Sequence, residues 1–224
     1  MTIFEQQMLA MASDIAQLRK DYSLHALTES EVDASPIKQF TQWWNQAVES
    51  KIDEVNAMTL STVHQLGYPE SRIVLLKGYS DQGFVFFTNY QSDKGLQLQN
   101  NAHCALLFFW KELERQVRIS GTATKISEKD SDDYFMSRPE GSQIGAWASP
   151  QSKVVENQEW LHENFEKIQR SFDNKVISRP PHWGGFIVCP KTIEFWQGRP
   201  SRMHDRIRYS AQQNSEWKIE RLAP

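Results

Sequence analysis

Apolar and polar positions along the chain alternate between a strand-like and a helix-like spacing. Five segments rich in β-branched and aromatic residues predict strands at 57–64, 71–79, 84–89, 102–110 and 114–126. Turn signals such as Leu66-Gly67-Tyr68-Pro69 separate several of these segments. A short helical insert is expected at about 92–100. The pattern therefore predicts a meander of five strands with one helix inserted.

Helical spacing is found on both sides of this strand-rich region. A helix is predicted to begin near Ser35, with Pro36 at its first position. Its core-facing residues are expected to be Ile37, Phe40, Trp44, Ala47 and Val48. Further helices are predicted at 128–138, 141–147 and 153–172. Strands are then expected to resume at 184–190, 192–197, about 202–210 and 217–222.

The predicted helices between 128 and 172 are here called the helical excursion. Strands that resume after it favour one barrel, completed late in the sequence, over two separate domains. The expected fold is mainly β with flanking helices, in the α+β class. Residues 1–34 are expected to form an N-terminal arm or lid, and 35–224 a single domain. Because the N-terminus lacks a basic start, it is a poor secretory signal, and a cytoplasmic location is expected. Cys104 and Cys189 are expected to be buried free thiols in a reducing compartment.

Charge and missing motifs narrow the function. The 224 residues carry a net charge of −3, so no bulk field favours nucleic acid or an anionic membrane. No apolar run approaches the roughly 20 residues that span a bilayer. The glycine-rich nucleotide motifs, the C-x-x-C pair, closely spaced histidines and G-x-S-x-G do not occur. Rossmann, P-loop, zinc and serine-hydrolase sites are therefore unsupported.

Two segments that carry cationic side chains could hold an anion. Arg72 opens an apolar segment and Lys77 closes it, so on a regular strand they face opposite ways unless one lies past its end. Thr88 and Lys94 flank a turn into the predicted short helix, where a phosphate could bind. Cations at strand ends and an ordinary capped turn are the alternative interpretations.

Three further patterns concern one face of an element. Gln116 and Arg118 share a strand face, and a glutamine amide suits the carbonyl and N–H edge of a flavin ring. A solvated barrel face would look the same. Tyr134 and Arg138 share a helix face, with Ser142 at the start of the next helix. Together they would suit a phosphate dianion, although a surface Tyr–Arg pair is the alternative.

The last pattern is the segment from Arg202 to Arg206. If this segment is extended, Arg202, His204 and Arg206 share one face. Cations placed side by side repel one another unless an anion lies between them. This segment is therefore the least easily explained as solvated surface.

Several strings occur in one order from about Arg19 to the C-terminus: RIVLLK, ERQVRISG, YFMSRP, SQIGAWAS, WGGF, IEFWQG, HDR and WKIERLAP. This order resembles the pyridoxine/pyridoxamine 5′-phosphate oxidase family. The resemblance implies an FMN-binding split β-barrel of Greek-key type, present as a homodimer with FMN at the subunit interface. It also implies oxidation of pyridoxamine and pyridoxine 5′-phosphate by O2 to pyridoxal 5′-phosphate in vitamin B6 metabolism. Hydrogen peroxide, and ammonia from the amine, would be released.

The resemblance also implies roles for individual residues. FMN contacts are expected from Arg72, Ile73, Val74, Leu75, Lys77, Phe87, Thr88, Lys94, Gln116, Gln151, Ser152, Trp196 and Arg206. Substrate contacts are expected from Arg19, Tyr22, Lys77, Tyr134, Arg138, Ser142, Arg202 and His204. Arg202 and His204 are expected to flank the substrate ring as the catalytic pair. No metal and no general base are assigned.

This chain departs from the family pattern at Asp93, where the family usually has arginine. A carboxylate would repel a phosphate if it faced inward, so Asp93 is expected to point to solvent. Three other functions are compatible with the sequence. They are a flavin reductase or other FMN oxidoreductase on the same barrel, a non-catalytic flavin- or pyridoxal-phosphate-binding protein, and a dimeric barrel with solvated arginines.

Overall fold

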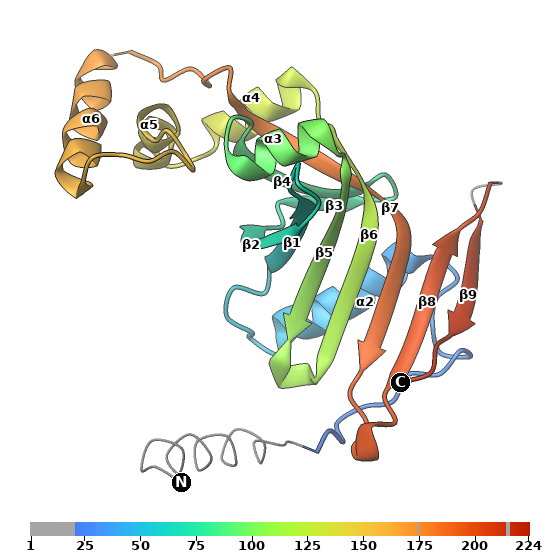
Figure 1. The fold of residues 1–224 in the computed structure, drawn as a ribbon. Coiled ribbons are helices and arrows are strands. Elements are labelled where there is room, and N and C mark those ends of the chain that lie inside the picture. The colour runs from blue at the N-terminus through green and yellow to red at the C-terminus, as the bar shows by residue number, and fades with distance from the viewer. Residues whose placement is uncertain (1–20, 174, 214–215) are drawn as a thin grey trace, which may run out of the picture.

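The structure is a computed structural model that describes residues 21–173, 175–213 and 216–224. One nine-stranded antiparallel sheet curls over a helix, and four further helices of the described part of the chain lie at one end of it (Figure 1). The strands are β1 (Ala57–Val63), β2 (Pro69–Leu75), β3 (Gly78–Ser80), β4 (Gly83–Asn89), β5 (His103–Trp110), β6 (Arg115–Lys125), β7 (Trp183–Gln197), β8 (Asp205–Ala211) and β9 (Trp217–Arg221). The helices are α2 (Pro36–Glu49), α3 (Asp93–Asn100), α4 (Glu128–Met136), α5 (Glu140–Ala148) and α6 (Gln158–Ser171), with short 3₁₀ turns η1 (Lys111–Leu113) and η2 (Pro200–Arg202).

The strand order is β2-β1-β5-β6-β7-β4-β3, with β8 added to β7 and β9 to β8. This order is more crossed than the predicted meander, because β7 enters the sheet between β6 and β4. Strands β7, β8 and β9, late in the sequence, thus join the same sheet as the early strands, as predicted. The mainly β class with flanking helices is confirmed as well.

Strand β7 belongs to both halves of the sheet. Its first part, from Trp183 to Val188, pairs with β4, and its last part, from Thr192 to Gln197, pairs with β8. The sequence predicted two strands here, and that prediction is wrong. Its register with β6 shifts between Ser120 and Gly121. A Cβ at Gly121 would lie 2.3 Å from the Cys189 carbonyl oxygen, so the bend requires a glycine.

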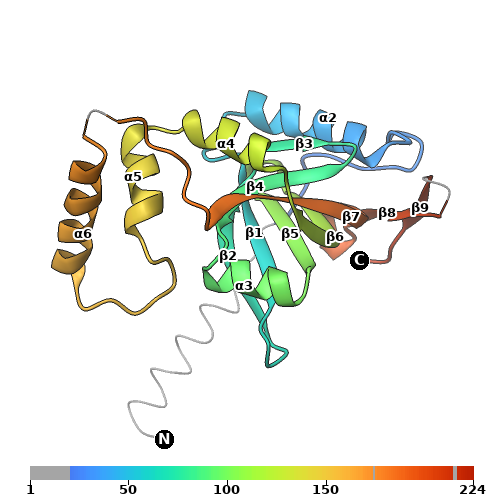
Figure 2. The same ribbon diagram turned by 90° about the horizontal axis from the view of Figure 1, so that it is seen from above.

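Helix α2 closes the concave face of the sheet (Figure 2). Ser35 is its N-cap and accepts a hydrogen bond from the Lys38 backbone N–H, and Pro36 occupies its first turn, as predicted. Phe40 is fully buried, and its ring lies 4.9 Å from Tyr79, 5.0 Å from Phe84 and 5.3 Å from Phe108, measured between centroids. Burial of one such side chain stabilises the fold by roughly 1.5–3 kcal/mol.

The buried stripe of α2 follows Ile37, Phe40, Trp43 and Ala47, at spacings of three and four residues. Val48 was predicted to face the core, but it lies one residue off this stripe and is 48% exposed. Trp43 is buried, and its neighbour Trp44 packs only partly against the core. The predicted start of the helix was correct, whereas one predicted core position was not.

A second, smaller core lies under the helical excursion. Phe135, Ile144, Ile177 and Trp183 form it, at the end of the molecule where α5 and α6 extend away from the sheet (Figure 1). Helix α6 was predicted to start at 153. It begins only after Asn157, whose side chain caps it by accepting from the Trp160 N–H, and none of its residues is fully buried.

Smaller differences from the predictions concern strand ends and cysteines. The predicted strand 71–79 is two strands, because the chain turns between β2 and β3 at Leu76 and Lys77. Cys104 is buried, and burial raises the pKa of its thiol to about 12. Cys189 is only half-buried, and both cysteines are free. Among the described helices, none is long and apolar enough to span a membrane.

Candidate functional site

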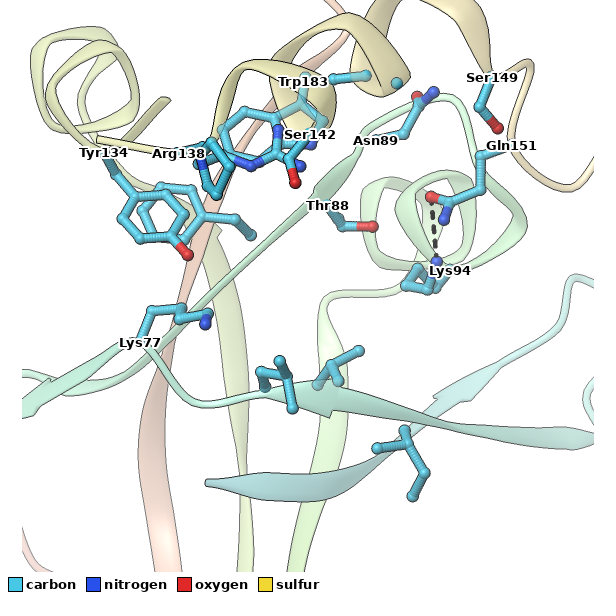
Figure 3. Close-up of a pocket in the computed structure, with 17 residues that line it drawn as sticks. Lys77, Thr88, Asn89, Lys94, Tyr134, Arg138, Ser142, Ser149, Gln151 and Trp183 are labelled. Carbon is cyan, nitrogen blue, oxygen red and sulfur yellow. Dashed lines mark hydrogen bonds between the residues drawn. The ribbon is translucent and has the colours of Figure 1, made fainter. Parts of the chain in front are cut away.

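A cavity of about 580 Å³ opens between the sheet and the helical excursion. Figure 3 shows side chains from α4, α5, β4 and the β2–β3 turn converging on it. Seventeen residues line it: Ile73, Val74, Leu75, Lys77, Phe87, Thr88, Asn89, Lys94, Tyr134, Arg138, Pro139, Ser142, Gly145, Ala146, Ser149, Gln151 and Trp183. Eleven of these are residues for which the sequence predicted a cofactor or substrate contact. Its volume suits a ring-shaped ligand of moderate size.

One wall of the cavity is a stack of flat groups. The Tyr134 ring stacks on Phe87 with centroids 3.9 Å apart, and Phe87 stacks on Trp183 at 5.4 Å. The Arg138 guanidinium carbon lies 4.5 Å from the centre of the Trp183 ring. Helix α4 ends at Met136, so Arg138 lies past its end rather than on the predicted helix face. The stack nevertheless brings Tyr134 and Arg138 to one cavity, with Ser142 beside them on α5 (Figure 3).

The guanidinium of Arg138 is not fully hydrogen-bonded within the described residues. Its Nη1 atom is buried and has no hydrogen-bond partner among the described residues. Burial also lowers the pKa of Arg138. A buried donor without a partner is unfavourable, so the protein leaves this part of the guanidinium unsatisfied beside the cavity.

The opposite end of the cavity is the turn into α3. Ser92 caps this helix by accepting from the Gly95 N–H, and the Lys94 ammonium lies 3.4 Å from both Ser92 Oγ and Gln151 Oε1. Burial, and secondly the neighbouring positive charge of Arg72, lower the pKa of Lys94. Asp93 begins the helix with its side chain exposed, as predicted. Its charge partly offsets these effects on Lys94.

Arg72 does not line the cavity. Its Nη1 donates to the Thr62 hydroxyl and to the Glu70 carbonyl, and its Nη2 lies 3.2 Å from Gln97 Oε1 and 3.4 Å from Glu70 Oε2. These contacts connect β2 with β1 and α3. Lys77 lies past the end of β2 and does line the cavity, so the second of the two geometries considered for this pair is the observed one.

A second group of predicted residues lies away from this cavity, on the outer face of β6, β7 and β8. Gln116 pairs in register with Trp196, and Trp196 with Arg206, so these three form a row across the strands, here called the Gln116 row. Val117 on the opposite face is fully buried, as the strand alternation predicted. Arg206 donates from Nε and Nη2 to the two carboxylate oxygens of Glu194, at 2.8 and 3.2 Å. These bonds raise the pKa of Arg206.

The turn before β8 carries Arg202 and His204. Because β8 begins only at Asp205, these residues are not on a strand, and the predicted shared face with Arg206 is wrong. Arg202 is exposed in η2 with a left-handed φ of 61°. The His204 ring lies 4.6 Å from Trp196, and its Nδ1 accepts from the Arg199 N–H at 3.1 Å. Burial and then Arg202 lower the pKa of His204, so the turn favours a neutral imidazole.

Of the remaining predicted residues, Tyr22 lies edge-on to Trp196 and His204, with centroids 5.8 and 5.9 Å away. Ser152 is exposed next to Gln151 and does not line the cavity. Arg19 lies outside the described residues. The sequence did not single out Trp183, although it precedes the Gly184-Gly185 pair that allows β7 to approach Tyr90 and Phe87. A tryptophan next to two glycines was the available signal.

The chain matches two models of one known protein family. A family model described as pyridoxamine 5′-phosphate oxidase matches residues 45–172. The chain belongs to the pyridoxine/pyridoxamine 5′-phosphate oxidase family. A second family model, the pyridoxine 5′-phosphate oxidase C-terminal dimerisation region, matches residues 183–224, which include the Gln116 row's β7 and β8 members.

Individual relatives agree with this membership. A pyridoxine/pyridoxamine 5′-phosphate oxidase from Cyanothece sp. is 51% identical over 214 residues, which are 96% of this chain and 100% of the relative. The crystal structure of PhzG from Burkholderia lata, in complex with tetrahydrophenazine-1-carboxylic acid, has a TM-score of 0.83 and 27% identity, and the match covers 90% of this chain and 100% of PhzG. A pyridoxamine 5′-phosphate oxidase-related, FMN binding protein from Nostoc punctiforme has the same fold, with a TM-score of 0.70, 17% identity, and coverage of 86% and 100%.

Proposed function

We propose that this protein oxidises pyridoxamine 5′-phosphate and pyridoxine 5′-phosphate to pyridoxal 5′-phosphate with FMN as cofactor and O2 as final acceptor. The observation that carries the proposal is the convergence of Lys77, Lys94 and Arg138 on one cavity, in a chain of this family. None of the three forms an ion pair with a carboxylate among the residues that the structure describes. Such a site calls for anions, and FMN and the substrate each bring a phosphate.

The residues at the two ends of the cavity fit two phosphates. At the α3 end, Thr88, Lys94 and Gln151 would hold the FMN phosphate, close to the N-terminus of the helix. At the helical-excursion end, Arg138, Tyr134 and Ser142 would hold the substrate phosphate. Arg138, which lines the cavity and has no carboxylate partner among the described residues, would donate to this phosphate.

When bound, FMN would supply the acceptor for two electrons from carbon C4′ of the substrate, and O2 would then be reduced to hydrogen peroxide. The chain's own residues orient the reactants. The phosphate contacts fix the substrate at a point remote from C4′, which limits the orientations of its ring. Arg202 and His204 would contact the substrate ring from the turn before β8. For the amine, water then releases ammonia from the oxidised substrate and leaves the aldehyde.

A second copy of the chain completes the proposed site. The cavity and the Gln116 row lie on different parts of one chain, and the C-terminal match is to a dimerisation region. The exposed Phe109 extends the Gln116 row onto β5, and it is 51% exposed in the single chain. A partner covering this apolar side chain would place its own cavity opposite Gln116, Trp196 and Arg206. FMN would then lie between the subunits.

The likeness to PhzG raises a second candidate, oxidation of a reduced tricyclic acid. Tetrahydrophenazine-1-carboxylic acid carries a carboxylate and no phosphate, so it would leave part of the Arg138, Tyr134 and Ser142 cluster without a partner. The cavity therefore favours the phosphorylated substrate.

The test is a steady-state assay of the purified protein with FMN, O2 and pyridoxamine 5′-phosphate. We expect pyridoxal 5′-phosphate and hydrogen peroxide to form in equal amounts. Tetrahydrophenazine-1-carboxylic acid, and NADH as an electron donor, serve as competing substrates. Faster turnover of either competitor would contradict the proposal. Flavin binding without any turnover would indicate a carrier, and a colourless protein that takes up no FMN would indicate a barrel with neither role.

A further inference from the structure

Residues 22–29, here called the N-terminal strap, lie across the turn that carries Arg202 and His204 (Figure 1). Two carboxylates from distant parts of the chain hold the strap by its backbone. Glu114 Oε2 accepts from the Ser23 and Leu24 N–H groups at 2.9 and 3.2 Å. Asp205 Oδ2 accepts from the Leu27 N–H at 3.1 Å. Both anchors act on backbone groups, so they fix the path of the strap whatever its side chains are.

Glu114 forms hydrogen bonds with two different segments of the chain. Its side chain binds the strap, and its backbone carbonyl accepts from the Gly198 N–H at 2.8 Å and from Gln197 Nε2 at 3.3 Å. The residue is 2% exposed and has a left-handed φ of 55° just before β6. A single buried residue therefore links the strap to the end of β7.

The Tyr22 side chain packs directly against Gly198, the residue that follows β7. A Cβ at Gly198 would lie 2.6 Å from Tyr22 Cγ and 2.7 Å from Tyr22 Cβ. Real side chains do not approach so closely, and these atoms belong to the inner part of the Tyr22 side chain, which cannot swing away without moving the strap. The absence of a side chain at Gly198 thus creates the space in which Tyr22 lies edge-on to Trp196 and His204.

We propose that Glu114 is a positioning residue that fixes the N-terminal strap, and with it Tyr22, against Trp196 and His204. Its consequence is for substrate affinity rather than for cofactor binding or turnover. A strap that is already ordered loses less conformational entropy when substrate binds beside it. The proposal rests on the proposed function in one respect only, namely that substrate binds beside Tyr22 and His204.

Two variants at Glu114 separate this role from a structural one. Glu114→Asn tolerates the left-handed backbone, but its shorter side chain does not reach the strap. Glu114→Gln keeps the length and one acceptor oxygen. We expect Glu114→Asn to raise KM for pyridoxamine 5′-phosphate roughly tenfold, which is the order expected for loss of hydrogen bonds to a charged group, with kcat within about twofold of wild type. Glu114→Gln should restore most of the affinity.

Gly198→Ala tests the same contact from the other side without touching Glu114. It should raise KM in the same way by displacing Tyr22. Gly141→Ala is the matched control, because a Cβ there meets nothing within 4 Å. Hydrogen exchange of the 21–29 peptide gives a readout that needs no activity. The Ser23 and Leu24 amides should exchange faster in Glu114→Asn and Gly198→Ala than in wild type, Glu114→Gln and Gly141→Ala.

Unchanged KM and unchanged exchange in both Glu114→Asn and Gly198→Ala would overturn the proposal. Equal defects in Glu114→Gln and Glu114→Asn, accompanied by loss of flavin, would overturn it in favour of a purely structural role. If the wild-type protein does not oxidise pyridoxamine 5′-phosphate at all, the proposed function fails instead. The exchange comparison between Glu114→Asn and Glu114→Gln still decides in that case whether Glu114 holds the strap.

Discussion

The cavity and the region of the Gln116 row differ in how they use positive charge. In the cavity, Lys77, Lys94 and Arg138 have no carboxylate partner among the described residues. Around the row, each of three arginines is bound to a carboxylate: Arg206 to Glu194, Arg199 to Asp205, and Arg221 to Asp205 and Glu29.

This contrast indicates which region could bind an anion. The cavity's cations have no counter-ion from the described protein, so we propose that a ligand phosphate supplies it. Arginines already neutralised by the protein add little net charge, but their bonds hold backbone and side chains in place. The paired arginines near the Gln116 row therefore serve mainly to hold the structure in place. Arg202 differs from them, because it has no carboxylate partner among the described residues.

The largest expected effect is in the cavity. Arg138→Ala should lower kcat/KM for pyridoxamine 5′-phosphate by roughly 100-fold or more, because charged hydrogen bonds to the phosphate are lost. Oxidation of unphosphorylated pyridoxamine should change little. Arg170→Ala, on the exposed face of α6, is the control. Equal losses for both substrates would contradict phosphate binding at Arg138 and remove the contrast between the two regions.

The next largest effect is expected at Arg202, the arginine near the Gln116 row without a carboxylate partner among the described residues. Arg202→Ala should lower turnover roughly 10- to 100-fold, since an orienting contact to the substrate is lost, while FMN content stays near that of wild type. Flavin absorbance per protein and kcat measure the two quantities. Met203→Ala, an exposed neighbour in the same turn, serves as the control. Near-normal turnover in Arg202→Ala would end the role given to this residue.

The lowered pKa of His204 predicts how the stability of the folded protein depends on pH. Burial first, and Arg202 second, lower its pKa below the ordinary 6.5, so the folded protein favours the neutral ring that accepts from the Arg199 N–H. As pH falls, the unfolded chain takes up this proton before the folded one does, so stability declines from about pH 6.5 downward.

An NMR titration of the His204 imidazole measures this shift directly. We expect its midpoint to lie below 6.5 in wild type and to rise in Arg202→Ala, because a positive neighbour is removed. A midpoint above neutral pH in wild type would mean that His204 is mostly charged at neutral pH. The region of the Gln116 row would then attract anions as the cavity does.

The smallest expected effect is at Asp93. Its exposed carboxylate lies near Lys94 and Arg72 without entering the cavity. Asp93→Arg should tighten FMN binding by only a few fold, and less at high salt, since surface charges are screened. Asp93→Asn should give a smaller change in the same direction. If fluorescence titration finds FMN affinity unchanged in Asp93→Arg, this position plays no part in holding the cofactor here.

Local periodicity was enough to predict much of this molecule. The cap and the first turn of α2, the short helix α3 and the alternation around Val117 depend on neighbours in sequence, and each was correct. The continuity of β7 and the turn at Lys77 were missed, because pairing with distant strands decides them.

The candidate site shows the same limit more sharply. Tyr134, Arg138 and Ser142 lie close together in sequence, and the structure brings them to one cavity. The separation of Gln116 and Trp196 from that cavity could not be read from spacing, because it depends on the curl of the sheet. The strap contacts of Glu114 join residues about 90 positions apart, and no sequence pattern marks them.

We propose above that the cavity binds FMN beside a phosphorylated B6 substrate. The most direct test is the visible absorption spectrum of the purified protein loaded with FMN, recorded without oxygen before and after addition of pyridoxamine 5′-phosphate. We expect the visible flavin band to bleach on addition and to return when air is admitted. This change should be full in wild type and only weak in Arg138→Ala. A flavin band that pyridoxamine 5′-phosphate leaves unchanged would contradict it.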